Sequence, residues 1–156
     1  MQIRNFPNYR QTFEYDCGAQ ALHAILAFYG IDSNEMKIMK IAETNKYHGT
    51  SLRGLKKTAK YFGLKCAIKK MTIAELKQYL DQKIPVILML QAWSKKPIKN
   101  WRGAWNCGHY AIAIGYDNQK IIFADPAYIS RTYLNYQDLS RRWHDFDTRE
   151  NKKYYN

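Results

Sequence analysis

The stretch "QTFEYDCGAQALHAILAFYG", residues 11–30, decides the fold because it sets a cysteine at the first position of an amphipathic helix. Apolar side chains recur at helical spacing on one face, at Ala21, Leu22, Ile25, Leu26 and Tyr29. Gly30 follows, and glycine commonly ends helices. The sequence therefore predicts a helix over residues 17–29 that packs one face on a core and carries Cys17 at its start.

Three more helices are predicted in the first half of the chain. Their expected starts carry side chains that cap helices: Asp32 with Glu35, Thr50 or Ser51, and Thr72 with Glu75. Gly63 ends the second of them, and "LKCAIKK" at 64–70 then alternates apolar and polar residues as a strand does. Helices are thus expected to dominate the chain up to about residue 80.

Strand patterns dominate the second half. The predicted strands are "IPVILMLQ" at 84–91, "HYAIAIGYD" at 109–117, "KIIFADP" at 120–126 and "RTYL" at 131–134, followed by a short helix, "YQDLSRRWHD", at 136–145. Helices followed by strands indicate an α+β fold with an antiparallel sheet. The length suits one domain over residues 1–156.

Composition narrows the class of protein. The longest apolar runs are strand-sized and no apolar signal region opens the chain, so neither a membrane span nor a signal peptide is predicted and a cytoplasmic location is expected. Cys17, Cys66 and Cys107 form no Cys-x-x-Cys pair, which predicts no metal site and no disulfide framework. The net charge of +12 fits a solvated basic surface or an anionic partner, but without a recognition motif nucleic acid is not expected.

Cys17 has two interpretations. A free cysteine is commonly a small buried core residue. At a helix N-terminus, however, the helix dipole and the unpaired backbone N–H groups favour the thiolate, which is the nucleophilic form. Gly18 also leaves the approach to the sulfur open. The second interpretation requires an imidazole to take the proton of the thiol.

His109 is the best of the four histidines for that role. It follows Gly108 at the start of a predicted strand, which leaves room around its ring. A turn near Asp117 brings the next strand back, so that Asp125 lies opposite or diagonal to His109 and can orient the imidazole. Gln11, six residues before Cys17, can offer its amide to a developing oxyanion together with the backbone N–H of the cysteine.

These residues resemble a papain-like cysteine peptidase. The stretches "DCGAQALHAILAFYGI", "GTSLRGLKKTAKYFGLKC", "IPVILML" and "GHYAIAIGYD" are more closely similar to the double-glycine leader peptidases that precede bacteriocin-exporting transporters. The resemblance implies a papain-like fold, with N-terminal helices packed on a C-terminal antiparallel sheet. It also implies a peptide or protein substrate, Cys17 as nucleophile, His109 as general base and acid, Asp125 as its partner and Gln11 in the oxyanion hole, with no metal or cofactor.

The segment 92–108 departs from the transporter-linked pattern, and the ending "RRWHD" resembles stand-alone relatives. The segment 92–108 contains Trp93, Trp101 and Trp105, which precede Gly108 and His109. These tryptophans and Gly108 are expected to bind substrate on the rim of the cleft, or the tryptophans pack under the loop. On the first interpretation the loop selects residues other than Gly-Gly. Two alternatives to a peptidase stay open: an inactive peptide-binding relative, and a basic binding module on the same fold that recognises an anionic partner.

Overall fold

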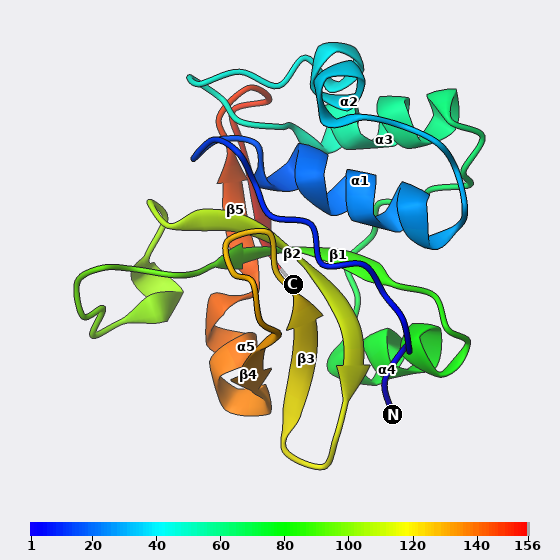
Figure 1. Cartoon of the computed structure of the whole chain (residues 1–156). Coiled ribbons are helices and arrows are strands. Elements are labelled where there is room, and N and C mark those ends of the chain that lie inside the picture. Colours follow the sequence, from blue (N-terminus) through cyan, green and yellow to red (C-terminus); the bar gives the residue numbers. More distant parts are fainter. Residues whose placement is uncertain (156) are drawn as a thin grey trace.

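The computed structural model describes residues 1–155. Its first half contains the helices α1 (Cys17–Phe28), α2 (Glu35–Ala42), α3 (Leu52–Tyr61) and α4 (Ile73–Asp81), as Figure 1 shows. Asn34, Ser51 and Thr72 each accept a hydrogen bond from a backbone N–H in the first turn, which explains where α2, α3 and α4 begin. The expectation that Asp32 caps α2 is wrong, because Asn34 supplies the capping oxygen.

Antiparallel strands make up most of the second half. They are β1 (Val86–Gln91), β2 (Gly108–Tyr116), β3 (Lys120–Ala124), β4 (Thr132–Asn135), β5 (His144–Asp147) and β6 (Lys152–Tyr155). The main sheet has the order β1-β2-β3-β4, and β5 pairs with β6 in a separate two-stranded sheet. The short helix α5 (Tyr136–Arg142) connects β4 to β5, and a 3-10 turn, η1 (Trp101–Gly103), lies between β1 and β2. The predicted α+β class is confirmed.

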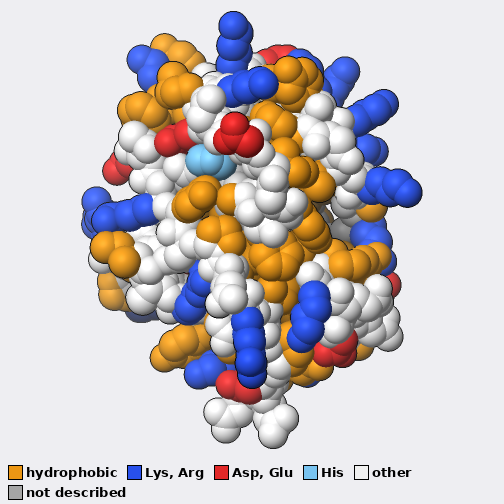
Figure 2. Space-filling model, turned by 45° about the vertical axis from the view of Figure 1, so that its right-hand side comes forward, with side chains coloured by type: hydrophobic (Ala, Val, Ile, Leu, Met, Phe, Trp, Pro, Cys, Tyr) orange, Lys and Arg blue, Asp and Glu red, His pale blue; other side chains and the backbone are white. Residues whose placement is uncertain are grey.

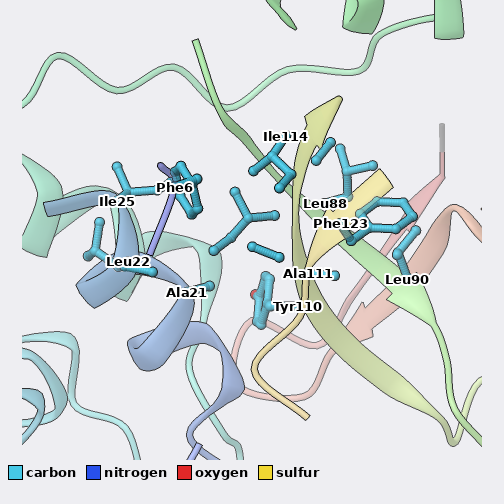
Figure 3. Packing of buried hydrophobic residues seen from close by; sticks show 14 of the residues in the cluster. Phe6, Ala21, Leu22, Ile25, Leu88, Leu90, Tyr110, Ala111, Ile114 and Phe123 are labelled. Atoms are coloured by element: carbon cyan, nitrogen blue, oxygen red, sulfur yellow. The ribbon is translucent and has the colours of Figure 1, made fainter. Parts of the chain in front are cut away.

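Helix α1 packs directly against β2 because both carry small residues where they meet. Ala21 of α1 and Ala111 of β2 are fully buried, and Figure 3 shows them between the larger core side chains. Leu22 and Ile25 from the helix and Ile114 from the strand belong to the same core cluster. Each such side chain contributes roughly 1.5–3 kcal/mol when it is fully buried. The close approach places the start of α1 next to the start of β2.

Two predicted elements differ from the structure. Residues 64–70 are not a strand, because no neighbouring backbone pairs with them and an alternating pattern alone does not make a ladder. The helix expected over 136–145 ends at Arg142. His144 instead begins β5, where its partner is Tyr155 of β6.

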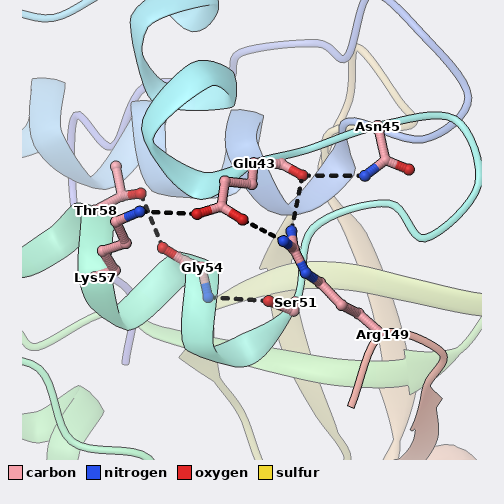
Figure 4. A network of polar contacts seen from close by, with 7 residues as sticks. All are labelled: Glu43, Asn45, Ser51, Gly54, Lys57, Thr58 and Arg149. Carbon is pink, nitrogen blue, oxygen red and sulfur yellow. Dashed lines mark hydrogen bonds and ion pairs between the residues drawn. The ribbon is translucent and has the colours of Figure 1, made fainter. Parts of the chain in front are cut away.

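The hairpin formed by β5 and β6 is tied to the helical half by a polar network (Figure 4). Its connecting turn carries Arg149, which donates to both the carboxylate and the backbone carbonyl of Glu43 at the end of α2. Lys57 of α3 donates to the same carboxylate at 2.9 Å. Asp147 of β5 accepts the backbone N–H of Leu52 at 3.1 Å, at the start of α3. The hairpin is therefore fixed against α2 and α3.

Candidate active site

Cys17 is half-buried at the first position of α1. The next residue, Gly18, permits the helix start to lie against β2, since a Cβ there would come within 2.9 Å of both Thr50 and the ring of Tyr110. Tyr110 is itself buried and directly follows His109. Glycine at position 18 thus brings the Cys17 thiol close to the histidine.

The His109 ring lies between an acid and a thiol. Its Nε2 is 2.7 Å from Oδ1 of Asp125, and the ring also hydrogen-bonds the Cys17 side chain. Because Nε2 is bonded to the carboxylate, Nδ1 is the nitrogen that is available to the sulfur. Burial opposes the charged ring, but the hydrogen bonds to Asp125 and Cys17 outweigh it and raise the pKa of His109 to about 10. The arrangement favours an imidazolium beside the sulfur.

Asp125 is fully buried and accepts four hydrogen bonds. Oδ1 receives His109 and the backbone N–H of Ala127, at 2.7 and 2.9 Å. Oδ2 receives the indole N–H of Trp93 at 2.6 Å and the hydroxyl of Thr132 at 2.9 Å. Burial alone would raise the pKa of Asp125, yet the bond from His109 and its other donors lower it. The carboxylate is therefore held ionised and in one orientation.

Gln11 is hydrogen-bonded to the residue that follows Asp125. Its backbone N–H donates to the carbonyl of Pro126 at 2.8 Å, one residue beyond Asp125. Its side-chain Nε2 donates to the carbonyl of Phe13 at 2.7 Å. Its Oε1 is buried and receives no hydrogen bond from the described residues. The second N–H of the Gln11 amide is left over as a donor.

The three tryptophans of the 92–108 segment point to three different places. Trp93 donates to Asp125 as described. Trp101 lies beneath the guanidinium of Arg142 on α5, with the carbon of that group 3.8 Å from the ring centre. Trp105 contacts the ring of His144 edge-on, with centroids 4.6 Å apart. Only the first of the three thus contacts the Asp125–His109 pair, and the other two anchor the segment to α5 and β5.

Gly108 borders the site next to His109 and is exposed. A Cβ at this position would lie 2.6 Å from both carboxylate oxygens of Asp145, so no side chain fits without moving the acid. Asp145 is 7% exposed and accepts a hydrogen bond from Gln91 at 2.7 Å. Burial, partly offset by the hydrogen bonds, raises the pKa of Asp145 to about 6.

Sequence reasoning missed two residues around the site, Thr132 and Asp145, and one contact, the hydrogen bond from Trp93 to Asp125. Thr132 lies in a predicted strand, and nothing in its spacing indicates that it contacts Asp125. Asp145 and His144 were expected on a helix, so the buried position of Asp145 beneath Gly108 could not be foreseen. Trp93 was singled out as a residue that binds substrate on the rim or packs under the loop, and its hydrogen bond to Asp125 was not predicted.

A separate apolar groove of about 700 Å³ runs between α3, β1 and residues 64–71. Its walls carry Leu55, Ile68 and Met89, and lysines lie along it at Lys56, Lys65, Lys69, Lys70 and Lys152. Figure 2 shows apolar side chains gathered on one face of the molecule with Lys and Arg side chains around them. Neither Cys17 nor His109 lines this groove.

Two negative observations apply to the described part of the chain. Among residues 1–155, no three His, Cys, Asp or Glu side chains are grouped closely enough to hold a metal ion. Within the same range, every helix is too short or too polar to pass through a lipid bilayer.

A known transport protein is similar in sequence to most of this chain. PedD, the pediocin PA-1 transport/processing ATP-binding protein of Pediococcus acidilactici, is 24% identical over 134 residues. The match covers 85% of this chain but only 17% of PedD, so the chain spans about a sixth of that relative's length.

Solved structures show the same fold. The peptidase domain of Streptococcus ComA, a bi-functional ABC transporter of a quorum-sensing pathway, superposes with a TM-score of 0.67 at 23% identity, covering 88% of this chain and 93% of that domain. A double-glycine-motif protease from an AMS/PCAT transporter, solved with its leader peptide, gives 0.59 at 14% identity, covering 91% and 87%.

The family assignment rests on most of the chain. The model of the Peptidase C39 family matches residues 5–146, which include the whole of the Cys17, His109 and Asp125 arrangement. The helices packed on an antiparallel sheet agree with the papain-like fold of the matched peptidase domains. The chain belongs to the Peptidase C39 family and is a cysteine peptidase.

Proposed function

We propose that Cys17 is the nucleophile of this peptidase and His109 its general base and acid. The observation that carries the proposal is the position of the His109 ring, which is hydrogen-bonded to Asp125 through Nε2 and interacts with the Cys17 thiol. An imidazolium at that place stabilises the thiolate, as does the N-terminus of α1.

The reaction then runs in two halves. The Cys17 thiolate attacks the carbonyl carbon of the scissile bond, and His109 gives its proton to the leaving amine, which leaves an acyl group on sulfur as a thioester. A water molecule next gives a proton to His109 and attacks the thioester carbonyl. The product acid departs, and the thiolate and imidazolium are restored.

Asp125 orients the imidazole in this scheme. Its four hydrogen bonds fix the carboxylate, and the carboxylate in turn fixes the ring plane and the nitrogen that faces sulfur. Trp93 and Thr132 act through Asp125 and are positioning residues.

The oxyanion of each tetrahedral intermediate needs donors, and we assign them to the backbone N–H of Cys17 and the amide of Gln11. Gln11 is anchored beside the site through Pro126, and its Nε2 retains one N–H beyond the bond to Phe13. Such a donor typically accounts for about 10²–10³ in kcat.

The proposed substrate is a peptide. One matched structure is described as a double-glycine-motif protease in complex with a leader peptide, and PedD is described as a transport/processing protein. We infer that this chain cleaves a peptide segment laid across Cys17. Cleavage-site profiling on a peptide library that includes Gly-Gly sequences identifies the residues that it accepts.

Labelling with a peptide electrophile tests the assignment of the nucleophile. The probe should modify Cys17 and spare Cys66 and Cys107, which serve as internal controls within the same chain. His109→Ala should slow the labelling, because the thiolate loses its imidazolium. Equal labelling of all three cysteines, or a rate unchanged by His109→Ala, would contradict the proposed roles.

A further inference from the structure

Two buried carboxylate oxygens near Cys17, one of them on the preceding residue, lack hydrogen-bond donors among the described residues. Oδ1 of Asp16 and Oε1 of Glu35 are both buried, and neither receives a hydrogen bond from a donor among the described residues. The two side chains lie close together, because Thr12 donates its backbone N–H to Asp16 and its hydroxyl to Glu35. Two ionised carboxylates have no hydrogen to share, since each offers only acceptors.

A single proton held between Oδ1 of Asp16 and Oε1 of Glu35 gives both oxygens a hydrogen-bond partner. We propose that Asp16 and Glu35 share a single proton at these oxygens, and that the resulting carboxylic acid–carboxylate pair positions Gln11 for the reaction. Here "the acid pair" means Asp16 and Glu35. The second half of the proposal rests on the oxyanion role given above to Gln11, whereas the shared proton does not depend on that role.

The remaining oxygens of the acid pair hold the segment that follows Gln11. Oδ2 of Asp16 accepts the backbone N–H groups of Thr12 and Phe13 at 3.1 and 3.0 Å. Oε2 of Glu35 accepts the hydroxyl of Thr12 at 2.9 Å. Every oxygen of the pair is thereby used once the proton is in place.

This segment connects directly to the proposed oxyanion donor. The Gln11 amide donates to the carbonyl of Phe13, whose own N–H is held by Asp16. On the other side, the backbone of Gln11 is bound to Pro126. Gln11 is therefore held at its backbone by Pro126 and at its side chain, through Phe13, by the acid pair. The acid pair consists of the first residue of α2 and the residue before Cys17.

The electrostatic surroundings of Asp16 agree with a retained proton. The side chain is 0% exposed. Burial and the neighbouring Glu35 raise the pKa of Asp16 to about 6, against the lowering effect of the Phe13 and Thr12 backbone N–H groups. Glu35, from α2, is the charged side chain that faces Asp16 from another element. As pH rises past about 6 the proton leaves, and the two carboxylates repel each other.

Amide substitutions test the proton directly. In Glu35→Gln, the new N–H can donate to Oδ1 of Asp16 at every pH while the amide oxygen still accepts from Thr12. The variant therefore imitates the protonated pair permanently. Glu14→Gln, which changes an exposed carboxylate of the same segment, is the matched control.

The first readout needs no activity. Infrared spectra of the Cys17→Ala protein, recorded below and above about pH 6, should show a protonated-carboxyl band that is lost on deprotonation. That band should be missing when Glu35→Gln is added and intact when Glu14→Gln is added. A band unaffected by Glu35→Gln overturns the shared proton, whatever the activity of the enzyme.

The second readout is the pH profile of kcat. Glu35→Gln should match the parent below about pH 6 and exceed it progressively above that pH, while Glu14→Gln follows the parent throughout. Glu35→Ala should lose kcat at all pH values, approaching the loss of Gln11→Ala. If the infrared result holds but kcat of Glu35→Gln and Glu35→Ala both equal the parent value, the proton is real and the positioning of Gln11 is refuted.

The sign of the stability effect gives a third check. A carboxyl with a raised pKa in the folded state favours folding while it is protonated, so the contribution of Asp16 to the stability of the parent should decline as pH rises from about 4 to about 6. The melting temperature of Glu35→Gln should fall less over this interval than that of the parent or Glu14→Gln. An equal fall in all three proteins contradicts the proposal.

Discussion

The two flanks of Cys17 are built differently. On the histidine flank, every oxygen of Asp125 is satisfied, by donors from β2, the 92–108 segment, residue 127 and β4. On the glutamine flank, Oε1 of Gln11 is buried and accepts no hydrogen bond from residues 1–155, and Nε2 donates to the carbonyl of Phe13. The difference shows that the imidazole is held by a fully bonded carboxylate, whereas the side chain of Gln11, the proposed oxyanion donor, is only partly bonded.

The variant with the largest expected effect is Cys17→Ala, which tests whether both flanks act on a reaction at the sulfur of Cys17. Cys17→Ala should lower kcat by about 10⁴-fold or more, since loss of a nucleophile typically removes nearly all covalent catalysis. The fold should survive, because the side chain is small and half-buried at a helix start. Peptide hydrolysis by the variant close to the parent rate would contradict the role of Cys17 as nucleophile. Circular dichroism of the variant checks that the fold is unchanged.

Asp125→Asn probes the fully bonded flank. Whichever way the new amide is turned, its NH₂ group faces at least one donor, either Trp93 or the backbone of Ala127. We expect kcat to fall by about 10³-fold, between the loss of the nucleophile and the loss of an oxyanion donor. Adding Trp93→Phe removes one of the conflicting donors and should recover part of the loss. Strict additivity of the two changes would mean that the indole bond has no part in orienting Asp125.

Gln11→Ala probes the incomplete flank. The expected result is a fall in kcat of about 10²-fold with KM nearly unchanged, because the amide is needed mainly in the transition state. Steady-state kinetics on one peptide measure both constants. A rise in KM at constant kcat would show that Gln11 contributes to substrate binding, and the proposed oxyanion role would then be wrong.

Trp93→Phe alone should have a smaller effect. It removes one of four hydrogen bonds to Asp125, and a bond to a charged group contributes about 1.5–3 kcal/mol, which corresponds to roughly tenfold or more in kcat if it is expressed in the transition state. Trp101→Phe is the matched control, since it lies in the same segment but contacts Arg142. Equal losses in kcat from both variants would show that they act through the segment as a whole.

The pH dependence of stability gives the most specific signal. The pKa of His109 is raised in the folded state, from 6.5 to about 10. Its stabilising contribution is therefore complete below about pH 6.5 and is lost as pH rises through about 10. Urea unfolding of the parent should show this decline, and His109→Gln should lack it. A decline of the same size in His109→Gln would locate the titration elsewhere.

Local patterns predicted the residues that depend on local structure. Cys17 is recognisable because a helix pattern begins at it, and His109 because a glycine precedes a strand pattern. Asp125 follows from the hairpin, whose register pairs Ile112 with Ala124. The bond from Trp93 to Asp125 spans 32 residues and arises in a segment without periodicity, so no spacing rule reaches it. The strand beginning at His144 depends on pairing with β6, which a single-segment pattern does not contain.

The contact between Gly108 and Asp145 has a consequence for protein engineering. A library randomised at position 108 alone would return glycine, because any larger residue collides with the Asp145 carboxylate. Shortening Asp145 makes room, but it also removes the acceptor of the Gln91 side-chain N–H, and the side-chain oxygen Oε1 of the same Gln91 accepts the backbone N–H of Cys107. Redesign of the rim beside His109 therefore has to vary positions 91, 108 and 145 together.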